Sequence, residues 1–248
     1  MNEITLTRMK QMKLYGMHDS FKTAIETGKT DSYSLDQFVS MIIDAEWDDK
    51  TNRRIERSIK NARFHYKASI ENIIFDDSRN IDKNKIFRLA ECDYVTNNQN
   101  VLITGSTGAG KSYLTTALGY QACIQGFKVS YFNTTKLFSK LKIAKADGSY
   151  LKELAKIQRQ NLIILDDFGL QPLDGQNRIA LLEIIEDRND RGSMIVSSQV
   201  PVKDWYDIIG EKTIADAILD RLIHQAHRIE LEGESMRKKR SILNKEND

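Results

Sequence analysis

Residues 105–112, GSTGAGKS, fit the phosphate-loop pattern G-x-x-x-x-G-K-[ST] at every fixed position. The apolar run 101–104 before the loop predicts a buried strand, and residues 113–122 after it predict a helix. In that setting the glycines let backbone N–H groups turn toward an anion, and the helix N-terminus adds partial positive charge. We expect Lys111 to reach the β- and γ-phosphates of a nucleotide and the Ser112 hydroxyl to hold Mg²⁺. All eight loop residues form the expected nucleotide cradle: Gly105, Ser106, Thr107, Gly108, Ala109, Gly110, Lys111 and Ser112.

A pair of acidic residues closes a second apolar run. Asp166 follows Lys111 by 55 residues and stands with Asp167 directly after residues 162–165. In open α/β sheets the C-terminal ends of strands face the ligand, so we expect Asp166 in the Mg²⁺ shell and Asp167 positioning or deprotonating the attacking water. The alternative is a buried strand followed by a polar turn at 168–169, and the phosphate loop upstream favours the nucleotide site.

Polar side chains also end the strand predicted for residues 194–199. If this strand lies between the loop strand and the acidic strand, its C-terminal end meets the γ-phosphate. Ser198 and Gln199 are both candidates for sensing hydrolysis, and we favour Gln199.

One arginine is placed to act on a neighbouring subunit. Arg221 lies in the Asp-Arg-Leu element of a helix predicted for residues 213–224. An arginine on a helix that leaves the nucleotide side can reach the γ-phosphate bound by a neighbouring subunit and stabilise it as an arginine finger. An intrahelical salt bridge or a simple contribution to solubility is the alternative.

A basic run, residues 50–67, carries seven basic residues and one acidic residue. Ile55, Ile59, Ala62 and Tyr66 recur at helical spacing and predict an apolar face. A helix of this kind suits a row of phosphates, because each neutralised phosphate releases condensed counterions. A solvated charged face is the alternative, and the near absence of acids favours nucleic acid. The predicted DNA-binding residues are Arg53, Arg54, Arg57, Lys60, Arg63 and Lys67.

Overall composition excludes several other classes of protein. The chain has 248 residues, 40% hydrophobic residues and a net charge of +2, enough for a sizeable core without a global charge excess. Cys92 and Cys123 stand far apart at no ligand spacing, which indicates reduced thiols rather than a disulfide or metal site. No signal-peptide core and no membrane-length apolar run occur, so we expect a cytoplasmic protein without a membrane partner.

The order of predicted elements defines the fold class. Residues 1–75 predict an all-helical N-terminal domain, in which Ser34 and Gln37 form a capping box before a helix. Residues 76–248 predict a RecA-like α/β domain, because five strand candidates alternate with helices. We therefore expect a mostly parallel five-stranded sheet.

Four segments together carry a family resemblance: GSTGAGKS, LIILDDFG, VSSQVPVKDWYDIIGEKTIADAILDRLIHQAHRIEL and GESMRKKR. With the helical N-terminal region, they closely resemble the IstB-like ATPases, which are transposition helper proteins of insertion sequences. These are AAA+ ATPases related to the bacterial replicative helicase loaders. The resemblance covers essentially the whole chain, and residues 196–231 are its most specific part.

The resemblance implies a function in DNA transposition. It implies binding to duplex DNA, ATP-dependent homo-oligomers on that DNA, and assistance to a partner transposase, with ATP and Mg²⁺ as cofactors. It also implies that Arg221 is the arginine finger, and that residues 1–75 contribute DNA binding and subunit contacts.

Two departures from general AAA+ design have consequences. Asp167 stands where most AAA+ proteins have Glu, and its shorter arm is consistent with slow turnover. About 17 residues follow the last predicted strand, so we expect no helical lid, and Arg237 in the tail is the candidate for a substitute sensor arginine.

Three other functions remain for comparison. A replicative helicase loader would bind single-stranded DNA and a helicase, whereas the basic run favours direct contact with DNA. An ATP-gated DNA-binding scaffold would tolerate loss of hydrolysis. A metabolic kinase fits poorly, because nothing beyond the phosphate loop indicates a small acceptor substrate.

Overall fold

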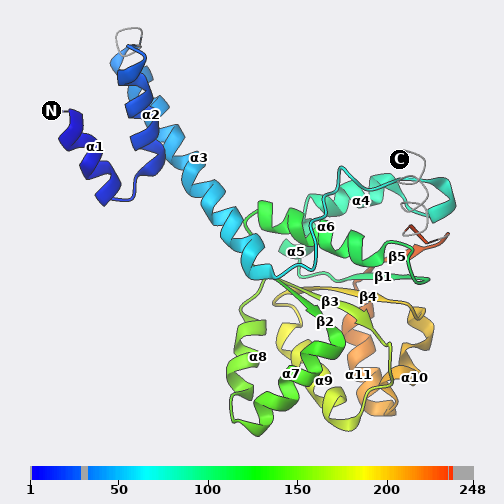
Figure 1. Cartoon of the computed structure of the whole chain (residues 1–248). Helices are drawn as coiled ribbons and strands as arrows, with labels where there is room; N and C mark the ends of the chain where they lie inside the picture. Colours follow the sequence, from blue (N-terminus) through cyan, green and yellow to red (C-terminus); the bar gives the residue numbers. More distant parts are fainter. Residues whose placement is uncertain (1, 29–32, 234, 237–248) are drawn as a thin grey trace, which may run out of the picture. The chain divides into compact units, whose positions relative to one another are not determined.

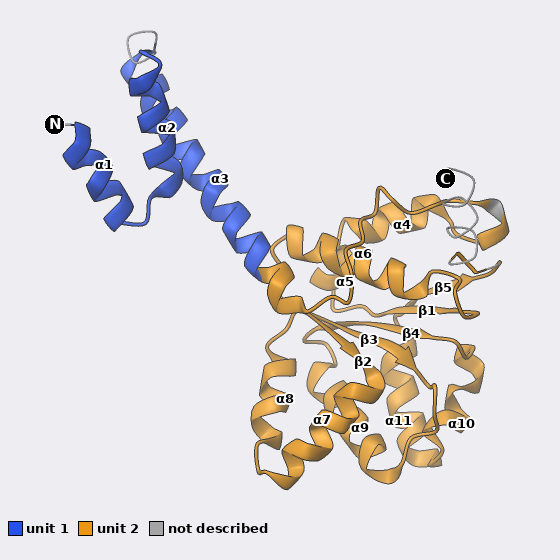
Figure 2. Cartoon of the chain, viewed as in Figure 1, with its two compact units in different colours: residues 1–57 blue, residues 58–248 orange. Residues whose placement is uncertain are grey.

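The computed structural model describes residues 2–28, 33–233, 235 and 236. The chain divides into two compact units, residues 1–57 and residues 58–248 (Figure 2). The sequence placed the boundary near residue 75. The boundary falls earlier because residues such as Ala62, Ala68 and Ile70 are buried in the core of the second unit.

The first unit is helical. It contains α1 (Asn2–Gln11), α2 (Tyr15–Glu26) and most of α3 (Leu35–Ala62). Phe21 and Phe38 meet edge to face, with ring centroids 6.0 Å apart. The predicted capping box is present: the Ser34 amide donates to Gln37 Oε1 over 3.0 Å, and the Gln37 amide donates to Ser34 Oγ over 3.3 Å.

One long helix, α3, takes in both the predicted helix after Ser34 and most of the basic run. It ends at Ala62, and Arg63 adopts a left-handed φ of 58°. The prediction of a helix through residue 67 is therefore wrong at its C-terminal end. A residue with positive φ stops an α-helix, so Tyr66 belongs to the following segment rather than to a helix face.

The second unit is built on a five-stranded parallel sheet in the order β2-β3-β4-β1-β5. This confirms the predicted α/β fold and places β4 between the loop strand and the acidic strand. The strands are β1 (Val101–Gly105), β2 (Val129–Asn133), β3 (Leu162–Phe168), β4 (Ser193–Ser198) and β5 (His227–Leu231).

Strand β3 runs further than the sequence indicated. It continues through both acidic residues to Phe168, and its pairing with β4 shifts between Leu165 and Phe168. Asp167 stands in this irregularity with a φ of 59°. A bulge re-aims side chains, so the two acids are presented by a distorted strand end rather than by a turn.

Helices cover both faces of the sheet in a three-layer arrangement (Figure 1). One core lies against α4, α5 and α6, and the other lies against α7 to α11. These elements, with two short 3₁₀ turns, are α4 (Lys83–Ala90), α5 (Asp93–Thr96), α6 (Lys111–Ile124), α7 (Thr134–Ala146), α8 (Tyr150–Gln158), α9 (Gly175–Arg188), α10 (Trp205–Ile209), α11 (Lys212–Ile223), η2 (Asp77–Arg79) and η3 (Val202–Asp204).

The described residues after β5 contain no helical lid. Among the described helices, none has the length and apolar character needed to cross a membrane.

Candidate nucleotide-binding site

The phosphate loop joins β1 to α6, as the sequence predicted. Lys111 begins α6 and is buried, with 5% of its surface exposed. Its Nζ donates to the carbonyl oxygens of Gly105 over 2.8 Å and Ser106 over 2.9 Å. The ammonium group is thus held over the loop, where phosphate oxygens can replace neutral carbonyl acceptors with stronger, charged ones.

Two loop glycines are required by close contacts. Gly105 has a φ of 147°, and a Cβ there would lie 2.2 Å from the carbonyl oxygen of Leu231 on β5. Gly110 has a φ of 98°, and a Cβ there would lie 2.6 Å from Arg79 Nη2. The loop therefore keeps its curvature only with glycine at these positions.

Asp166 is a buried carboxylate with three side-chain donors. Oδ1 accepts from Ser112 Oγ over 3.2 Å and from the Ser197 hydroxyl, and Oδ2 accepts from the Tyr131 hydroxyl. Burial, followed by the hydrogen bond to Asp166, raises the pKa of Tyr131, so this hydroxyl remains a proton donor. Ser197 and Tyr131 were missed from sequence because neither lies in a recognisable motif.

The Ser112–Asp166 pair fits magnesium. Hydroxyl and carboxylate oxygens are the hard ligands that Mg²⁺ prefers, and the ion usually takes only one or two protein ligands beside phosphates and water. The described residues contain no cluster of three or more His, Cys, Asp or Glu side chains that could hold a metal ion.

Asp167 is half-buried and lines a cavity that lies against the phosphate loop. Asn133, the last residue of β2, donates from Nδ2 to Asp167 Oδ2 over 3.1 Å. The backbone amide of Asp167 donates to Ser197 Oγ over 3.3 Å. These bonds fix the carboxylate at the strand ends, and Asn133 is a site residue that sequence patterns did not reveal.

The two candidates at the end of β4 have different environments. Gln199 Oε1 accepts from Thr107 Oγ1 of the phosphate loop over 2.6 Å. The Ser198 hydroxyl is buried, donates to the Phe168 carbonyl over 2.7 Å and accepts from the Val200 amide over 3.0 Å. Gln199 therefore lies at the phosphate loop, whereas Ser198 closes a local turn.

A cavity of about 510 Å³ lies against the phosphate loop. The loop, Asp167 and Gln199 contribute polar groups to its lining. Residues 65–81 contribute aromatic and aliphatic side chains, such as Tyr66 and Ile73, together with polar ones such as Asn72. A lining that combines polar and apolar groups suits a nucleotide with its phosphates and its base.

Arg79 braces this cavity from the segment before α4. It is 6% exposed, and its guanidinium donates to the carbonyls of Ile74 over 2.5 Å and Ala109 over 2.7 Å. Burial lowers the pKa of Arg79. The sequence offered no signal for this role, because a single arginine in a connector belongs to no motif.

Two described residues after β5, Gly233 and Met236, lie on the phosphate loop. The Met236 amide donates to the Gly108 carbonyl over 3.0 Å, and Ser106 Oγ donates to the Gly233 carbonyl over 3.5 Å. Arg237, the candidate sensor, lies outside the described residues.

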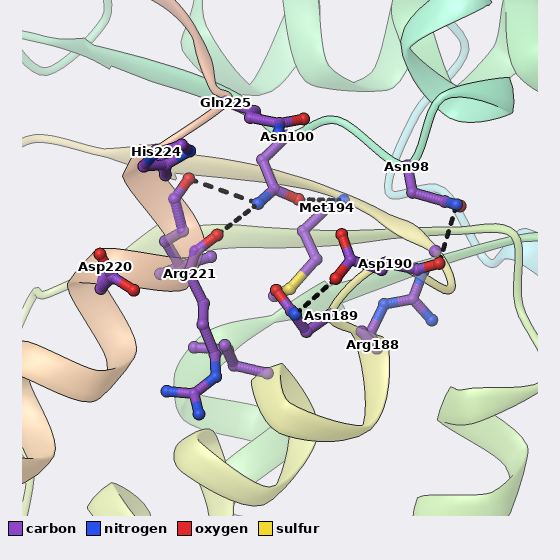
Figure 3. A pocket seen from close by; sticks show the side chains of 13 residues that line it. Asn98, Asn100, Arg188, Asn189, Asp190, Met194, Asp220, Arg221, His224 and Gln225 are labelled. Atoms are coloured by element: carbon purple, nitrogen blue, oxygen red, sulfur yellow. Dashed lines mark hydrogen bonds between the residues drawn. The ribbon is translucent and has the colours of Figure 1, made fainter.

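Arg221 is not part of the nucleotide cavity of its own chain. It lines a separate pocket of about 490 Å³ together with Asn100 and Asp220 (Figure 3). Its Nη1 donates to the Ala217 carbonyl over 2.7 Å, and its Nη2 lies 3.5 Å from Glu186 Oε1. Asn100 Nδ2 fixes the end of α11 by donating to the carbonyl of Arg221 over 3.2 Å. The residue therefore makes local contacts, in keeping with the salt-bridge alternative, while its side chain remains 32% exposed.

The six basic residues proposed for DNA differ in their surroundings. Arg53 belongs to the first unit, pairs with Asp49 and lies 4.8 Å from the centre of the Tyr15 ring. In the second unit, three of the set are exposed and make no ion pair within the described part of the chain: Lys60, Arg63 and Lys67. Arg54 and Arg57, in the first unit, are likewise exposed.

The sheet order, the phosphate loop with its buried lysine, and the acidic end of β3 define an AAA+ ATP-binding protein. The chain matches the IstB-like ATP binding protein family over residues 7–244. It therefore belongs to that family.

Curated relatives agree over nearly the full chain. An insertion sequence ATP-binding protein, y4pL, of Sinorhizobium fredii is 38% identical over 94% of this chain and 96% of its own length. The insertion sequence IS21 ATP-binding protein of Pseudomonas aeruginosa is 28% identical over 96% of this chain and 88% of its own.

Solved structures share the fold at low identity. The DnaC helicase loader has a TM-score of 0.55 at 19% identity, covering 69% of this chain and 100% of its own. AMPPCP-bound DnaA from Aquifex aeolicus has a TM-score of 0.60 at 17% identity, covering 75% of this chain and 57% of its own.

Proposed function

We propose that this protein is a Mg²⁺-dependent ATPase that assembles as a homo-oligomer on duplex DNA and assists a transposase. The observation that carries the proposal is the separation of Arg221 from the nucleotide cavity that contains Lys111 and Asp167. An arginine that lies outside the nucleotide cavity of its own chain can complete the site of a neighbouring copy. The curated relatives, which belong to insertion sequences, support the role in transposition.

Each residue of the cavity has a defined task in this proposal. Lys111 and the loop amides bind the phosphates, and Ser112 with Asp166 would hold Mg²⁺, which offsets phosphate charge. Asp167 orients the attacking water from its restrained position, and Gln199 senses the state of the γ-phosphate through its contact with Thr107.

Arg221 is available for such a contact in trans. Its ion pair with Glu186 is long and partly solvent-exposed, and exposed ion pairs contribute about 0–1 kcal/mol. Exchanging that partner for a phosphate therefore costs little. Hydrolysis then depends on assembly, and assembly depends on DNA.

Contact with DNA is assigned to the exposed basic residues of the predicted set, at and after α3. Within the described part of the chain, Lys60, Arg63 and Lys67 have no acidic partner to displace, so each can neutralise a phosphate directly. Phosphate contacts position a protein on the duplex without reading its sequence. We assign DNA binding and subunit contacts to residues 1–75, of which residues 58–75 belong to the second compact unit, and ATP hydrolysis to the site residues within 76–248.

The test is ATP turnover measured with and without duplex DNA across a range of protein concentrations. We expect negligible turnover without DNA, strong stimulation by duplex, and no turnover for Lys111→Ala in either case. Equal rates with and without DNA at high protein concentration would contradict the coupling. Preference for single-stranded over duplex DNA would instead support the helicase-loader alternative.

A further inference from the structure

Tyr131 lies between the magnesium carboxylate and the segment that follows α3. From β2, its hydroxyl donates to Asp166 Oδ2. Its ring meets the ring of Phe64 edge-on, with centroids 6.4 Å apart and planes at 69°. One side chain thus touches both the catalytic centre and the end of the basic run.

Tyr131 controls the orientation of Asp166. Ser112 and Ser197 both donate to Oδ1, and among the described residues Tyr131 is the side chain that donates to Oδ2. Asp166 is only 2% exposed, so bulk water does not readily replace a lost donor. With the hydroxyl in place, Oδ1 stays directed at Ser112, the other residue expected at magnesium.

The segment carrying Phe64 is packed against the elements of the site. Phe64 fits against Gly119 of α6, where a Cβ would lie 2.9 Å from the Phe64 ring. Tyr66 stacks on Tyr113, with centroids 6.2 Å apart and planes at 20°. Residues 64–66 thus contact Tyr131, which donates to Asp166, and α6, which carries Lys111 and Ser112. A displacement of residues 64–66 would therefore shift both residues expected at magnesium, Asp166 and Ser112.

The same segment presents positive charge outward. Arg63 and Lys67 are exposed and flank the aromatic residues. Arg63 has a φ of 58°, a conformation that costs a non-glycine residue about 1 kcal/mol or more. The turn that directs Phe64 to Tyr131 thus carries a long cationic side chain at a position where glycine would relieve strain.

We infer that Tyr131 is a positioning residue that couples binding of a polyanion at Arg63 and Lys67 to the orientation of Asp166. The inference rests on the proposed function, in which the polyanion is duplex DNA. Coupling of this kind is reciprocal, so DNA raises nucleotide affinity by the same factor by which nucleotide raises DNA affinity.

The experiment measures binding of a fluorescent ATP analogue at varied Mg²⁺, with and without duplex DNA. For the wild type we expect DNA to raise nucleotide affinity about tenfold. Tyr131→Phe keeps the ring but removes the hydroxyl. It is expected to bring that factor close to one and to raise the Mg²⁺ concentration at half-saturation about tenfold, while the lost hydrogen bond lowers the melting temperature only slightly and leaves the variant folded at the assay temperature. Its DNA affinity without nucleotide should equal that of the wild type.

Two further variants separate positioning from packing. Tyr120→Phe removes a hydroxyl of α6 that makes no hydrogen bond in the described part of the chain, and it should behave as wild type in every measurement. Phe64→Leu leaves the Tyr131 hydroxyl in place, so it should lose the DNA effect while its Mg²⁺ half-saturation stays within about twofold of wild type.

Failure of the inference is distinct from failure of the proposed function. If wild type shows coupling and Tyr131→Phe retains both the coupling factor and the Mg²⁺ half-saturation, Tyr131 does not position Asp166. If wild type binds no DNA, the proposed function is wrong. In that case the Mg²⁺ concentration at half-saturation, measured without DNA, still tests Tyr131. A rise for Tyr131→Phe supports its positioning of Asp166, and an unchanged value contradicts it.

Discussion

The side-chain amide of Asn133 donates to the carboxylate of Asp167 across the ends of β2 and β3, with Nδ2 and Oδ2 3.1 Å apart. Asp167 also occupies a left-handed φ of 59° within a distorted strand end. The residue expected to position water is therefore held in one orientation by its neighbour strand and by its own backbone.

This restraint makes two substitutions informative. Asp167→Asn should reduce DNA-stimulated ATP turnover by about 10²–10⁴-fold, because an amide cannot take the proton of water. Nucleotide affinity should change little, since phosphate binding is assigned to Lys111 and the loop. Asn133→Ala frees the carboxylate from the orientation in which Asp167 is expected to position water, so it should lower DNA-stimulated turnover with nucleotide affinity again little changed. Steady-state turnover and binding of a fluorescent ATP analogue check both, and wild-type turnover by Asp167→Asn would remove this residue from the mechanism.

Gln199 and Ser198 form a matched pair at the end of β4. Gln199→Ala removes the contact with Thr107 and should lower the turnover number about tenfold or more, with unfolding free energy unchanged. Ser198→Ala instead removes two buried local hydrogen bonds and should lower the unfolding free energy by about 1–3 kcal/mol. Turnover and urea denaturation of each variant distinguish the roles, and the opposite pattern would exchange them.

Arg221 can be tested by mixing two inactive variants. Arg221→Ala should bind ATP normally but lose about 10³-fold or more in DNA-stimulated turnover. Lys111→Ala should lose nucleotide binding and keep its arginine. If Arg221 acts on a neighbouring site, a mixture of the two variants on DNA regains turnover, because mixed contacts join an intact cavity to an intact arginine. No recovery at any ratio would argue for the local role beside Glu186.

The basic residues predict a graded dependence on salt. Replacing Lys60, Arg63 and Lys67 together by alanine should weaken duplex binding and reduce the slope of log affinity against log salt by about 3, roughly one unit per lost phosphate contact. Arg53→Ala serves as the contrast, because Arg53 is engaged by Asp49 and Tyr15. It should leave the slope nearly unchanged. A slope that is flat already in the wild type would remove the assignment of these residues to DNA.

The two cysteines predict a loss of stability at alkaline pH. Burial raises the pKa of Cys92 to about 12 and that of Cys123 to about 11, above the free value of 9.0. As pH rises above 9.0, the unfolded chain loses these protons while the native chain keeps them. Stability from the neutral buried thiols is therefore fully present below pH 9.0 and falls by up to about 1.4 kcal/mol per pH unit for each thiol above it.

Alkylation provides the check. Cys92 is 1% exposed and Cys123 is 0% exposed, so a thiol reagent should leave both unmodified in the native protein and react with both in urea. Urea denaturation on either side of pH 9 gives the stability change. Rapid modification of the native protein would contradict the burial of these thiols.

Much of the nucleotide site was predictable because it is local in sequence. The phosphate loop, its flanking strand and helix, and the acidic pair after an apolar run depend on neighbouring residues and on short-range backbone geometry. The fold class followed from the alternation of strands and helices. The sequence could not decide whether β4 lies between β1 and β3, and the sheet order shows that it does.

Contacts between distant segments could not be predicted in the same way. Tyr131, Asn133 and Arg79 belong to no motif, and each gains its role from a partner at least 30 residues away in the chain. The choice of Gln199 over Ser198 likewise depends on where the end of β4 meets the loop. Sequence by itself determined which residues have the chemistry expected for binding and hydrolysing a nucleotide. The tertiary structure decided which side chains hold them in place, because strand order and close packing, rather than spacing along the chain, determine which groups lie within hydrogen-bonding distance.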